Sequence, residues 1–323
     1  MLSFIARRCL SALPLLACVL TLVFVLVEAA PGDPFQIDPG PGVSREAGLR
    51  LRQIYGIDRP LPLRYLAWLK GFLTFDLGVS RSYREPVSAL VRRAIGNTLW
   101  LAGAALALEF LLGTAAGAAA AAWPRRAIDR LIGAAATVLY SVPSFWLALV
   151  LVSFLSVRLG WLPASQMHAV DAEALAAGPF FLDLLRHLVL PCLALALPSA
   201  AGIALYVRQE MKDLLGRPYV RIALARGAGR GGIVLRHALK NALLPVVNLF
   251  GSALPGLVGG SLVIEVLFAW PGMGRLAYQA VLARDTPLVL GCVWVASVAV
   301  VAGSLLADLL SAVLDPRVRE ARP

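Results

Sequence analysis

The chain alternates between long uninterrupted runs of apolar residues and short segments that carry most of its charge. A helix needs roughly 20 apolar residues to cross about 30 Å of hydrocarbon. Apolar residues occupy all faces of these runs instead of one stripe, as expected where lipid and protein both surround a helix. The pattern predicts six transmembrane helices, at Cys9–Val27, Trp100–Ala122, Leu131–Val157, Leu188–Val207, Ala242–Phe268 and Leu288–Leu314.

The first run also has features of a secretory signal. Arg7 and Arg8 precede it, and Val27 to Ala29 loosely fits a cleavage site. The run is longer than the roughly 7–15 apolar residues of a signal peptide. We therefore interpret it as a retained helix, with a cleaved signal as the alternative.

The distribution of Lys and Arg predicts the orientation of the helices, because cytoplasmic segments carry the excess of these residues. With the N-terminus inside, the cytoplasmic segments 1–8, 123–130, 208–241 and 315–323 hold sixteen Lys and Arg. The two short outer loops, 158–187 and 269–287, hold four. Both termini are therefore predicted to be cytoplasmic. The domain organisation is 1–30 as the first helix, 31–97 as an outer loop and 98–323 as a five-helix core with the cytoplasmic loop 208–241.

The outer loop contains two stretches with helical periodicity. Tyr65, Leu66, Leu69, Phe72 and Leu73 follow Pro62, which suits the first turn of a helix. A second set follows Pro86: Val87, Leu90, Val91 and Ile95. We expect two amphipathic helices on the outer surface, where they either pack against the bundle or form a docking platform for a soluble partner.

Composition agrees with a membrane protein. Of the 323 residues, 59% are hydrophobic and 15% charged, whereas soluble domains have about 45–50% and about 25%; the mean hydropathy is +0.77. The formal net charge is +11, and only Lys70, Lys212 and Lys240 among the 30 cations are lysines. The four cysteines all lie in apolar runs without metal-ligand spacing, which disfavours a disulfide framework or a zinc site.

The sequence lacks catalytic motifs. It has neither HExxH nor GxSxG, and none of its three lysines stands in the Gly-Lys-Ser/Thr context of a Walker A loop. Gly227, Gly229 and Gly232 match GxGxxG, but no predicted strand precedes them, so a turn between helices is the better interpretation. The chain is predicted not to be an enzyme, and any ATP hydrolysis would belong to another subunit.

The segment 208–241 is the longest cytoplasmic piece and carries eight cations against two anions. A short helix, a glycine break and a second helix fit its pattern, although anionic lipid alone would explain the arginines. Its sequence resembles the EAA-type loop of bacterial ABC importer permeases, specifically the B-type subunit of the dipeptide/oligopeptide (and nickel) permeases. The matching stretches here are Tyr219–Gly227 and Leu235–Pro245.

The resemblance covers nearly the whole chain, in the same order. Further matching stretches are Ala30–Pro34, Tyr55–Pro62, Phe75–Gly78, Ser141–Trp146, Arg158–Ser165, Glu265–Gly274 and Leu314–Arg317. It implies an all-α membrane protein with the type I ABC importer permease fold, six transmembrane helices and an extended periplasmic loop between the first two.

The resemblance also implies a coupling helix around Tyr219–Gly227 that docks on an ATPase subunit. Arg221 and Ile222 replace the Glu-Ala pair of the general motif, a form that the peptide-permease branch shares. The residues expected to couple the chain to the ATPase are Tyr219, Arg221, Ala223, Ala225, Arg226, Gly227 and His237. Those expected in the translocation path or outer gate are Ser141, Pro143, Glu265, Phe268, Trp270, Pro271 and Gly272.

The partners implied by the resemblance are a second, C-type permease, two ABC ATPases and a periplasmic or lipid-anchored binding protein. The complex would lie in the bacterial inner membrane and import di-/oligopeptides or a related small solute. No cofactor would bind this chain, since ATP and Mg²⁺ would bind the ATPases. Related permeases carry peptides, nickel, glutathione and sugars, so the substrate itself is open.

Three acids in or near the predicted spans leave a second function open. Glu109, Glu265 and Asp308 would each be costly in hydrocarbon, which makes them functional candidates. A proton-coupled secondary transporter would use such acids, whereas pairing with arginine would make them structural.

Proline and glycine residues in the spans are also open to two interpretations. The prolines are Pro143, Pro191, Pro198, Pro245 and Pro255. Gly113 and Gly117, and the cluster at 256–260, permit close helix contact. Packing is the simpler role for all of them, and a gate built from kinked helices is the alternative.

Overall fold

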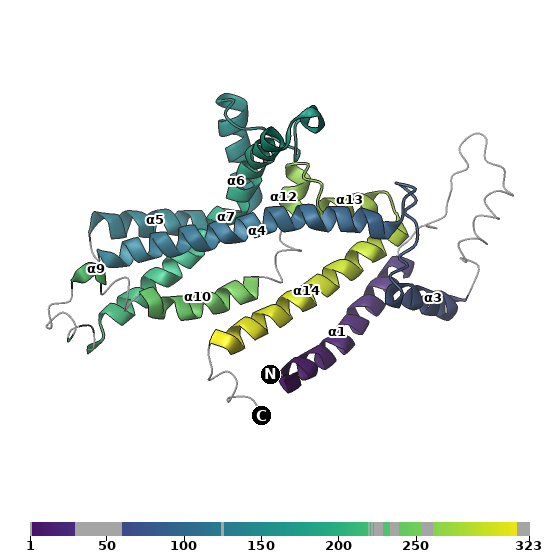
Figure 1. Cartoon of the computed structure of the whole chain (residues 1–323), viewed down its shortest axis with the longest axis horizontal. Helices are drawn as coiled ribbons and strands as arrows, with labels where there is room; N and C mark the ends of the chain where they lie inside the picture. The colour runs from purple at the N-terminus through teal and green to yellow at the C-terminus, as the bar shows by residue number, and fades with distance from the viewer. Residues whose placement is uncertain are drawn as a thin grey trace. The chain divides into compact units, whose positions relative to one another are not determined.

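The computed structural model describes residues 2–29, 60–123, 126–218, 220, 222, 229–232, 239–253 and 261–314 of the chain (Figure 1). Nearly all of them are helical. The main helices are α1 (Leu2–Ala29), α3 (Leu61–Leu73), α4 (Val87–Ala122), α5 (Ala127–Ser141), α6 (Ser144–Leu151), α7 (Ala177–Leu215), α10 (Lys240–Ala253), α12 (Leu262–Leu267), α13 (Met273–Leu282) and α14 (Thr286–Leu314). Short pieces are the π-helix η1 (Val152–Arg158), the 3₁₀ helix η2 (Ala172–Ala174) and α9 (Arg230–Gly232).

The chain forms two compact units, which are described separately. The first comprises Met1–Ile95 and Leu276–Ala299, and the second comprises Gly96–Arg275 and Val300–Pro323. The predicted domain boundaries at residues 30 and 97 stay a prediction.

Aromatic side chains hold the first unit together. Phe24 of α1 lies 5.3 Å from Tyr65 and 5.1 Å from Trp68 of α3, between ring centroids. Phe72, at the other end of α3, stacks on Trp294 of α14 at 5.6 Å. The predicted amphipathic helix at Leu61–Leu73 is therefore present, and one of its faces packs inside the unit.

The second predicted amphipathic helix is not a separate element. Residues from Val87 onward belong to α4, which continues without a break to Ala122. Val87, Leu90 and Val91 are buried. The reason is local: α4 contains no proline, so nothing stops the helix where the amphipathic pattern gives way to the apolar run.

Helix α7 is the centre of the second unit. Residues of α7 belong to four hydrophobic clusters. One is shared with α4, one with α4 and α10, one with α6 and α12, and one with α5. On the α5 side the cluster consists of Ala136, Ala201 and Ala204, whose small side chains permit close packing. Pro191 and Pro198 lie inside α7 without ending it.

Within the described residues, three helices are long and apolar enough to cross a membrane: Val87–Ala122, Ala177–Leu215 and Thr286–Leu309. The predicted span at Leu131–Val157 is instead a pair, Ala127–Ser141 and Ser144–Arg158, bent by 104°. Val142, which precedes Pro143, is extended at φ −85° and ψ 125°, the conformation that a following proline favours. The chain is thus a multi-pass helical membrane protein, and six spans stay a prediction.

Candidate translocation and coupling sites

The residues predicted to couple the chain to an ATPase lie outside the described residues. They are Tyr219, Arg221, Ala223, Ala225, Arg226, Gly227 and His237. The structure does describe the helices that flank this segment, α7 up to Leu215 and α10 from Lys240. Their part in coupling stays a prediction.

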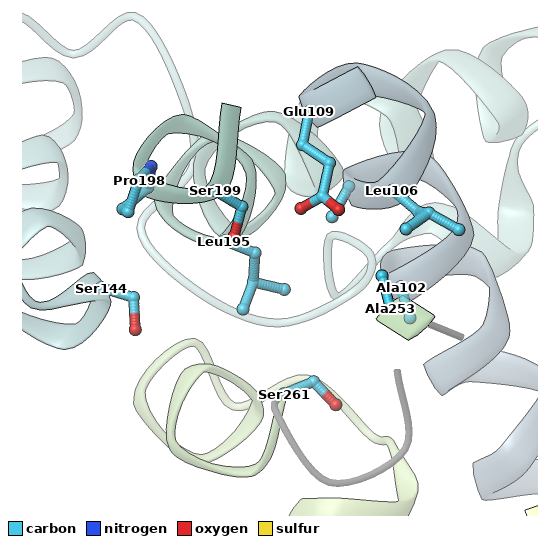
Figure 2. A pocket seen from close by; sticks show the side chains of 10 residues that line it. Ala102, Leu106, Glu109, Ser144, Leu195, Pro198, Ser199, Ala253 and Ser261 are labelled. Atoms are coloured by element: carbon cyan, nitrogen blue, oxygen red, sulfur yellow. The ribbon is translucent and has the colours of Figure 1, made fainter. Parts of the chain in front are cut away.

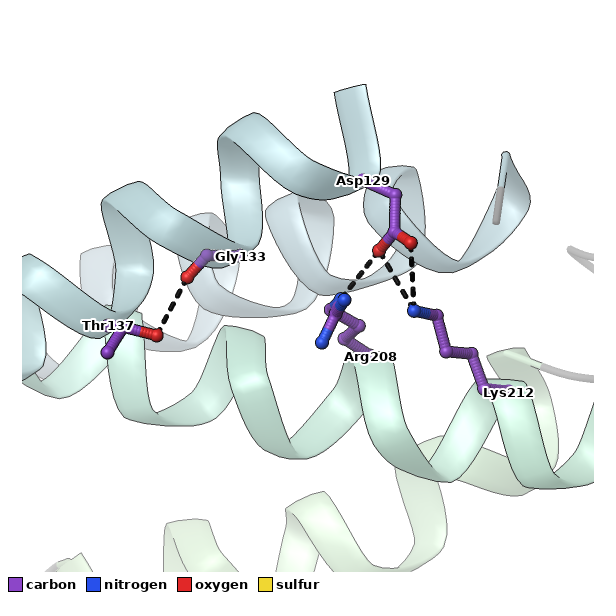
Figure 3. Close-up of polar contacts among 5 residues, drawn as sticks. All are labelled: Asp129, Gly133, Thr137, Arg208 and Lys212. Atoms are coloured by element: carbon purple, nitrogen blue, oxygen red, sulfur yellow. Dashed lines mark hydrogen bonds and ion pairs between the residues drawn. The ribbon is translucent and has the colours of Figure 1, made fainter. Parts of the chain in front are cut away.

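An ionic cluster joins α5 to the end of α7 that leads into this segment (Figure 3). Asp129, in the first turn of α5, accepts hydrogen bonds from Arg208 Nε at 2.6 Å and from Lys212 Nζ at 2.9 and 3.0 Å. The Asp129 side chain is 5% exposed, and those of Arg208 and Lys212 are 27% and 26% exposed. We call these three residues the Asp129 cluster. It fixes the α5 N-terminus to α7 about one turn before α7 ends at Leu215.

The sequence alone does not reveal the Asp129 cluster, since Arg208 and Lys212 contribute there only to the positive charge predicted to be cytoplasmic. A signal is present, because Asp129 is the only acid in the segment 123–130, which is predicted to be cytoplasmic. An acid within a basic segment favours pairing, but its partners lie 79 and 83 residues away and no local spacing reveals them.

The contact between α4 and α7 depends on two glycines. A Cβ atom at Gly113 would lie 2.7 Å from the Ala200 carbonyl oxygen, and one at Gly117 would lie 2.6 Å from that of Ala204. Both contacts involve backbone, which cannot move aside as a flexible side chain can. The prediction that this Gly-xxx-Gly pair permits close helix contact is therefore confirmed.

Replacing Gly117 with leucine should separate α4 from α7 and reduce the yield of folded protein. Overpacking of this kind costs about 1–3 kcal/mol or more, and here the clash is with backbone. Size-exclusion chromatography of the detergent-solubilised protein measures the folded fraction. Gly103→Leu on the same helix is the control, because a Cβ at Gly103 meets no atom within 4 Å. Equal yields from the two variants would contradict the contact.

A second buried acid organises the turn between α12 and α13. Both side-chain oxygens of Glu265 are engaged: Oε1 accepts from Thr98 Oγ1 at 2.8 Å and Ser261 Oγ at 2.7 Å, and Oε2 accepts from the Arg275 backbone N–H at 3.1 Å. Thr98 Oγ1 in turn accepts from the Met273 N–H at 2.8 Å. Glu265 and Thr98 are fully buried. We call these interactions the Glu265 network.

The same turn is fastened to α4 by two further hydrogen bonds. Trp270 Nε1 donates to the Asn97 carbonyl oxygen, and Asn97 Nδ2 donates to the Pro271 carbonyl oxygen, each at 2.9 Å. Gly272 lies against the acid, since a Cβ there would be 2.5 Å from Glu265 Cδ. Only glycine fits at this position without displacing the carboxylate.

The structure brings together five of the seven residues predicted for the path or outer gate. Glu265, Phe268, Trp270 and Gly272 are buried in or beside the turn, and Pro271 is exposed on it. Ser141 and Pro143 lie apart from them, at the sharp break between α5 and α6, where the Ser141 hydroxyl donates to the Thr137 carbonyl oxygen at 3.0 Å. A gating role for all seven stays a prediction.

The two histidines His168 and His187, which are scattered in the sequence, converge on one acid. His168 Nδ1 lies 3.0 Å from Asp183 Oδ2, and His187 Nδ1 lies 3.3 Å from Asp183 Oδ1. The His168 ring also stacks on Phe180 at 4.2 Å. These contacts hold the loop 158–176 against the start of α7.

A cavity of about 390 Å³ opens between α4, α7 and their neighbours in the second unit (Figure 2). Glu109 of α4 and Ser199 of α7 both project into it, and Figure 2 shows the two side chains on the same side of the cavity. Ser144 and Ser261 stand across the cavity. The lining residues are Ala102, Ala105, Leu106, Glu109, Ser144, Leu195, Pro198, Ser199, Ala253 and Ser261.

The three acids singled out in the sequence thus have different surroundings. Glu265 is enclosed by its network, and Glu109 faces the cavity. Asp308 is half-buried on α14 and is not among the residues that line the cavity. A carboxylate at the bilayer centre costs roughly 2.5–3.5 kcal/mol on insertion scales. Glu265 accepts three hydrogen bonds, which offset that cost. Glu109 instead lies in the cavity wall with the Ser199 hydroxyl.

Comparison with known proteins identifies the family. Residues 113–320 match the family "Binding-protein-dependent transport system inner membrane component", and residues 1–102 match the N-terminal model of the same transport-system membrane components.

Full-length relatives agree. The chain is 35% identical to the oligopeptide transport system permease protein AppB of Bacillus subtilis, over 98% of this chain and 99% of that protein. It is 39% identical to a peptide permease protein of Brucella suis, over 99% of both chains. It is 35% identical to the glutathione transport system permease protein GsiC of Salmonella paratyphi A, again over 99% of both.

A solved structure of the methionine ABC transporter MetNI in an inward-facing conformation matches 72% of this chain and 97% of its own at 21% identity and a TM-score of 0.48. The resemblance to ABC importer permeases of the dipeptide/oligopeptide class is confirmed by the family and its full-length relatives. The chain belongs to the family of inner-membrane components of binding-protein-dependent transport systems.

Proposed function

We propose that this chain is the transmembrane subunit of an ATP-driven importer of di- or oligopeptides or a related small solute. The observation that carries the proposal is full-length similarity to permeases named for peptides and for glutathione, which is itself a tripeptide-sized solute. The cavity of about 390 Å³ beside Glu109 supports it, since its size lies within the roughly 300–1,000 Å³ of small-molecule sites.

The translocation path is completed by a second permease in this proposal. The fold is that of type I importer permeases, with six spans and both termini in the cytoplasm. A binding protein delivers the solute to the outer face, and two ATPase subunits hold ATP and Mg²⁺. Family membership supports this arrangement in general terms.

The coupling helix Tyr219–Gly227 transmits movement of the ATPases to the spans. The described residues supply a route for that movement. α7 ends at Leu215, just before the coupling helix, and the Asp129 cluster ties α7 to α5 at that end. A shift of the coupling helix therefore displaces α5 and α7 together. Because α7 is also packed on α4, α6 and α10, the shift reaches the walls of the cavity.

The proposal that partner subunits hydrolyse ATP while this chain forms the path is tested with the purified chain alone and with the complete complex. The chain by itself should hydrolyse no ATP, and uptake by the complete complex should require ATP and withstand an uncoupler. Hydrolysis by the isolated chain would overturn the proposal. Uptake that collapses with an uncoupler at constant ATP would favour the proton-coupled alternative built on Glu109, Glu265 and Asp308.

Replacing Gly227 with tryptophan should abolish uptake while leaving membrane insertion intact. The bulky side chain would prevent the coupling helix from docking, and a loss of only about 1.4 kcal/mol in docking lowers its equilibrium constant tenfold. Uptake into proteoliposomes and co-purification of the ATPases are the two measurements. Gly216→Trp is the control: Gly216 is exposed and precedes the coupling helix. Normal uptake by Gly227→Trp would exclude this docking site.

A further inference from the structure

The half-buried Glu109 carboxylate differs from the two buried acids of the second unit in lacking an ion pair or a set of hydrogen-bond donors among the described residues. Asp129 binds two cations, and Glu265 accepts three hydrogen bonds. Glu109 has the Ser199 hydroxyl beside it in the cavity wall, and no lysine or arginine among the described residues forms an ion pair with it. Structural pairing therefore accounts for the first two acids and leaves Glu109 unexplained.

The surroundings of Glu109 leave space for a ligand. Alanines contribute much of the wall, which keeps the cavity open, and Figure 2 shows the carboxylate directed into it. A second cavity, of about 560 Å³, also includes Glu109, Ser199 and Ala253 in its lining. Glu109 thus lines two cavities of the same unit.

The polar groups of the cavity are few and spread out. Besides Glu109 and Ser199, the hydroxyls of Ser144 and Ser261 line it. The Ser261 hydroxyl donates to Glu265 Oε1 at 2.7 Å. Among the described residues that line it, the cavity therefore offers one carboxylate and three hydroxyl groups, and the others are apolar. This combination suits a solute with a positively charged amino group and amide N–H donors.

We propose that Glu109, with Ser199 beside it in the cavity wall, binds the ammonium group of the solute during its passage. The ligand class is a primary ammonium with an adjoining amide, as at the amino terminus of a peptide. The inference rests on the proposed function, because it names a contact for the solute in the path of that importer. A single carboxylate with one hydroxyl orients the solute and still releases it, which transport requires.

The first experiment uses the complete complex in proteoliposomes with trialanine as the probe. Glu109→Gln should lower the rate of trialanine uptake about tenfold or more, as expected when a charge-assisted hydrogen bond is lost. ATPase activity stimulated by the binding protein should be unchanged. Glu109→Asp should retain part of the uptake because the charge remains. Glu85→Gln, an exposed glutamate outside the cavity, should transport normally.

The second experiment identifies the ammonium group as the ligand. Dicyclohexylcarbodiimide is an apolar reagent that modifies buried carboxyl groups, and mass spectrometry locates the modified residue. Trialanine should protect Glu109 from modification, whereas N-acetyl-trialanine at the same concentration should not, because it lacks the charge. Equal protection by the two peptides would overturn the proposal, and so would normal uptake by Glu109→Gln.

The remaining outcomes separate this proposal from the function on which it rests. If Glu109→Gln prevents co-purification of the second permease, Glu109 pairs with a cation of that subunit, and the proposal is overturned. If the wild-type complex takes up no trialanine with ATP present, the peptide-import function fails. In that case, protection of Glu109 by trialanine but not by N-acetyl-trialanine would still establish that Glu109 binds an ammonium group.

Discussion

Glu265→Ala should destabilise the protein by about 3–5 kcal/mol, the largest effect that we expect from a single substitution. The change leaves the hydroxyls of Thr98 and Ser261 and the backbone N–H of Arg275 without their acceptor. Each unsatisfied buried group costs about 1–3 kcal/mol. The same change leaves an empty volume beside Gly272, which packs on the carboxylate. The thermal unfolding midpoint of the detergent-solubilised protein measures the loss.

Two variants make this prediction specific. Glu265→Gln keeps the shape and one acceptor oxygen, but its NH₂ group faces the Arg275 N–H, so an intermediate loss is expected. Glu85→Ala removes an exposed glutamate paired with Arg93, and exposed pairs contribute only about 0–1 kcal/mol. If Glu265→Ala unfolds at the same temperature as Glu85→Ala, the Glu265 network does not stabilise the turn.

Removing the Asp129 carboxylate should have the second largest effect, on both stability and transport. Asp129→Ala leaves Arg208 and Lys212 close together with no anion between them. Breaking a buried ion pair costs about 3–5 kcal/mol, and the partial exposure of the two cations places this variant at about 2–4 kcal/mol. Because the cluster ties α5 to α7, uptake per ATP hydrolysed should also fall. Thermal unfolding and uptake by the complete complex measure the two effects.

The control and a rescue variant separate charge from packing. Asp213→Ala removes an exposed acid on the same end of α7 whose carboxylate accepts from Gln209 at 3.2 Å, and little change is expected. Replacing Asp129, Arg208 and Lys212 together with leucine should restore most of the stability, since apolar residues often substitute for a buried ionic group. It should not restore uptake if the ionic tie transmits the movement. A triple variant as unstable as Asp129→Ala would refute the electrostatic explanation.

The acids show how far sequence reasoning extends. Hydropathy places Glu109 and Glu265 in apolar runs and so makes both functional candidates. It does not distinguish them, because the donors of Glu265 come from Thr98, 167 residues away, and from a backbone N–H group ten residues on. Only tertiary contacts distinguish the satisfied acid from the one that faces a cavity.

The prolines lead to the same conclusion. Pro143, Pro191 and Pro198 all lie in predicted spans, and each removes a backbone donor. The chain bends by 104° at Pro143, yet α7 continues through Pro191, which is buried, and Pro198, which is half-buried on the cavity wall. The lost hydrogen bond is the same in each case. The difference lies in the tertiary packing of α7, which contacts several neighbouring helices.

By itself, the sequence determined the membrane class, the apolar runs within α4, α7 and α14 and the family, because these depend on composition and on short motifs read along the chain. It also determined the helix at Leu61–Leu73 and the close-contact glycines of α4. The tertiary structure alone decided which charges are paired, where a span breaks and which acid faces the cavity. Those properties depend on the free energy of groups that are distant in sequence and meet only when α4, α5, α7 and α12 pack together.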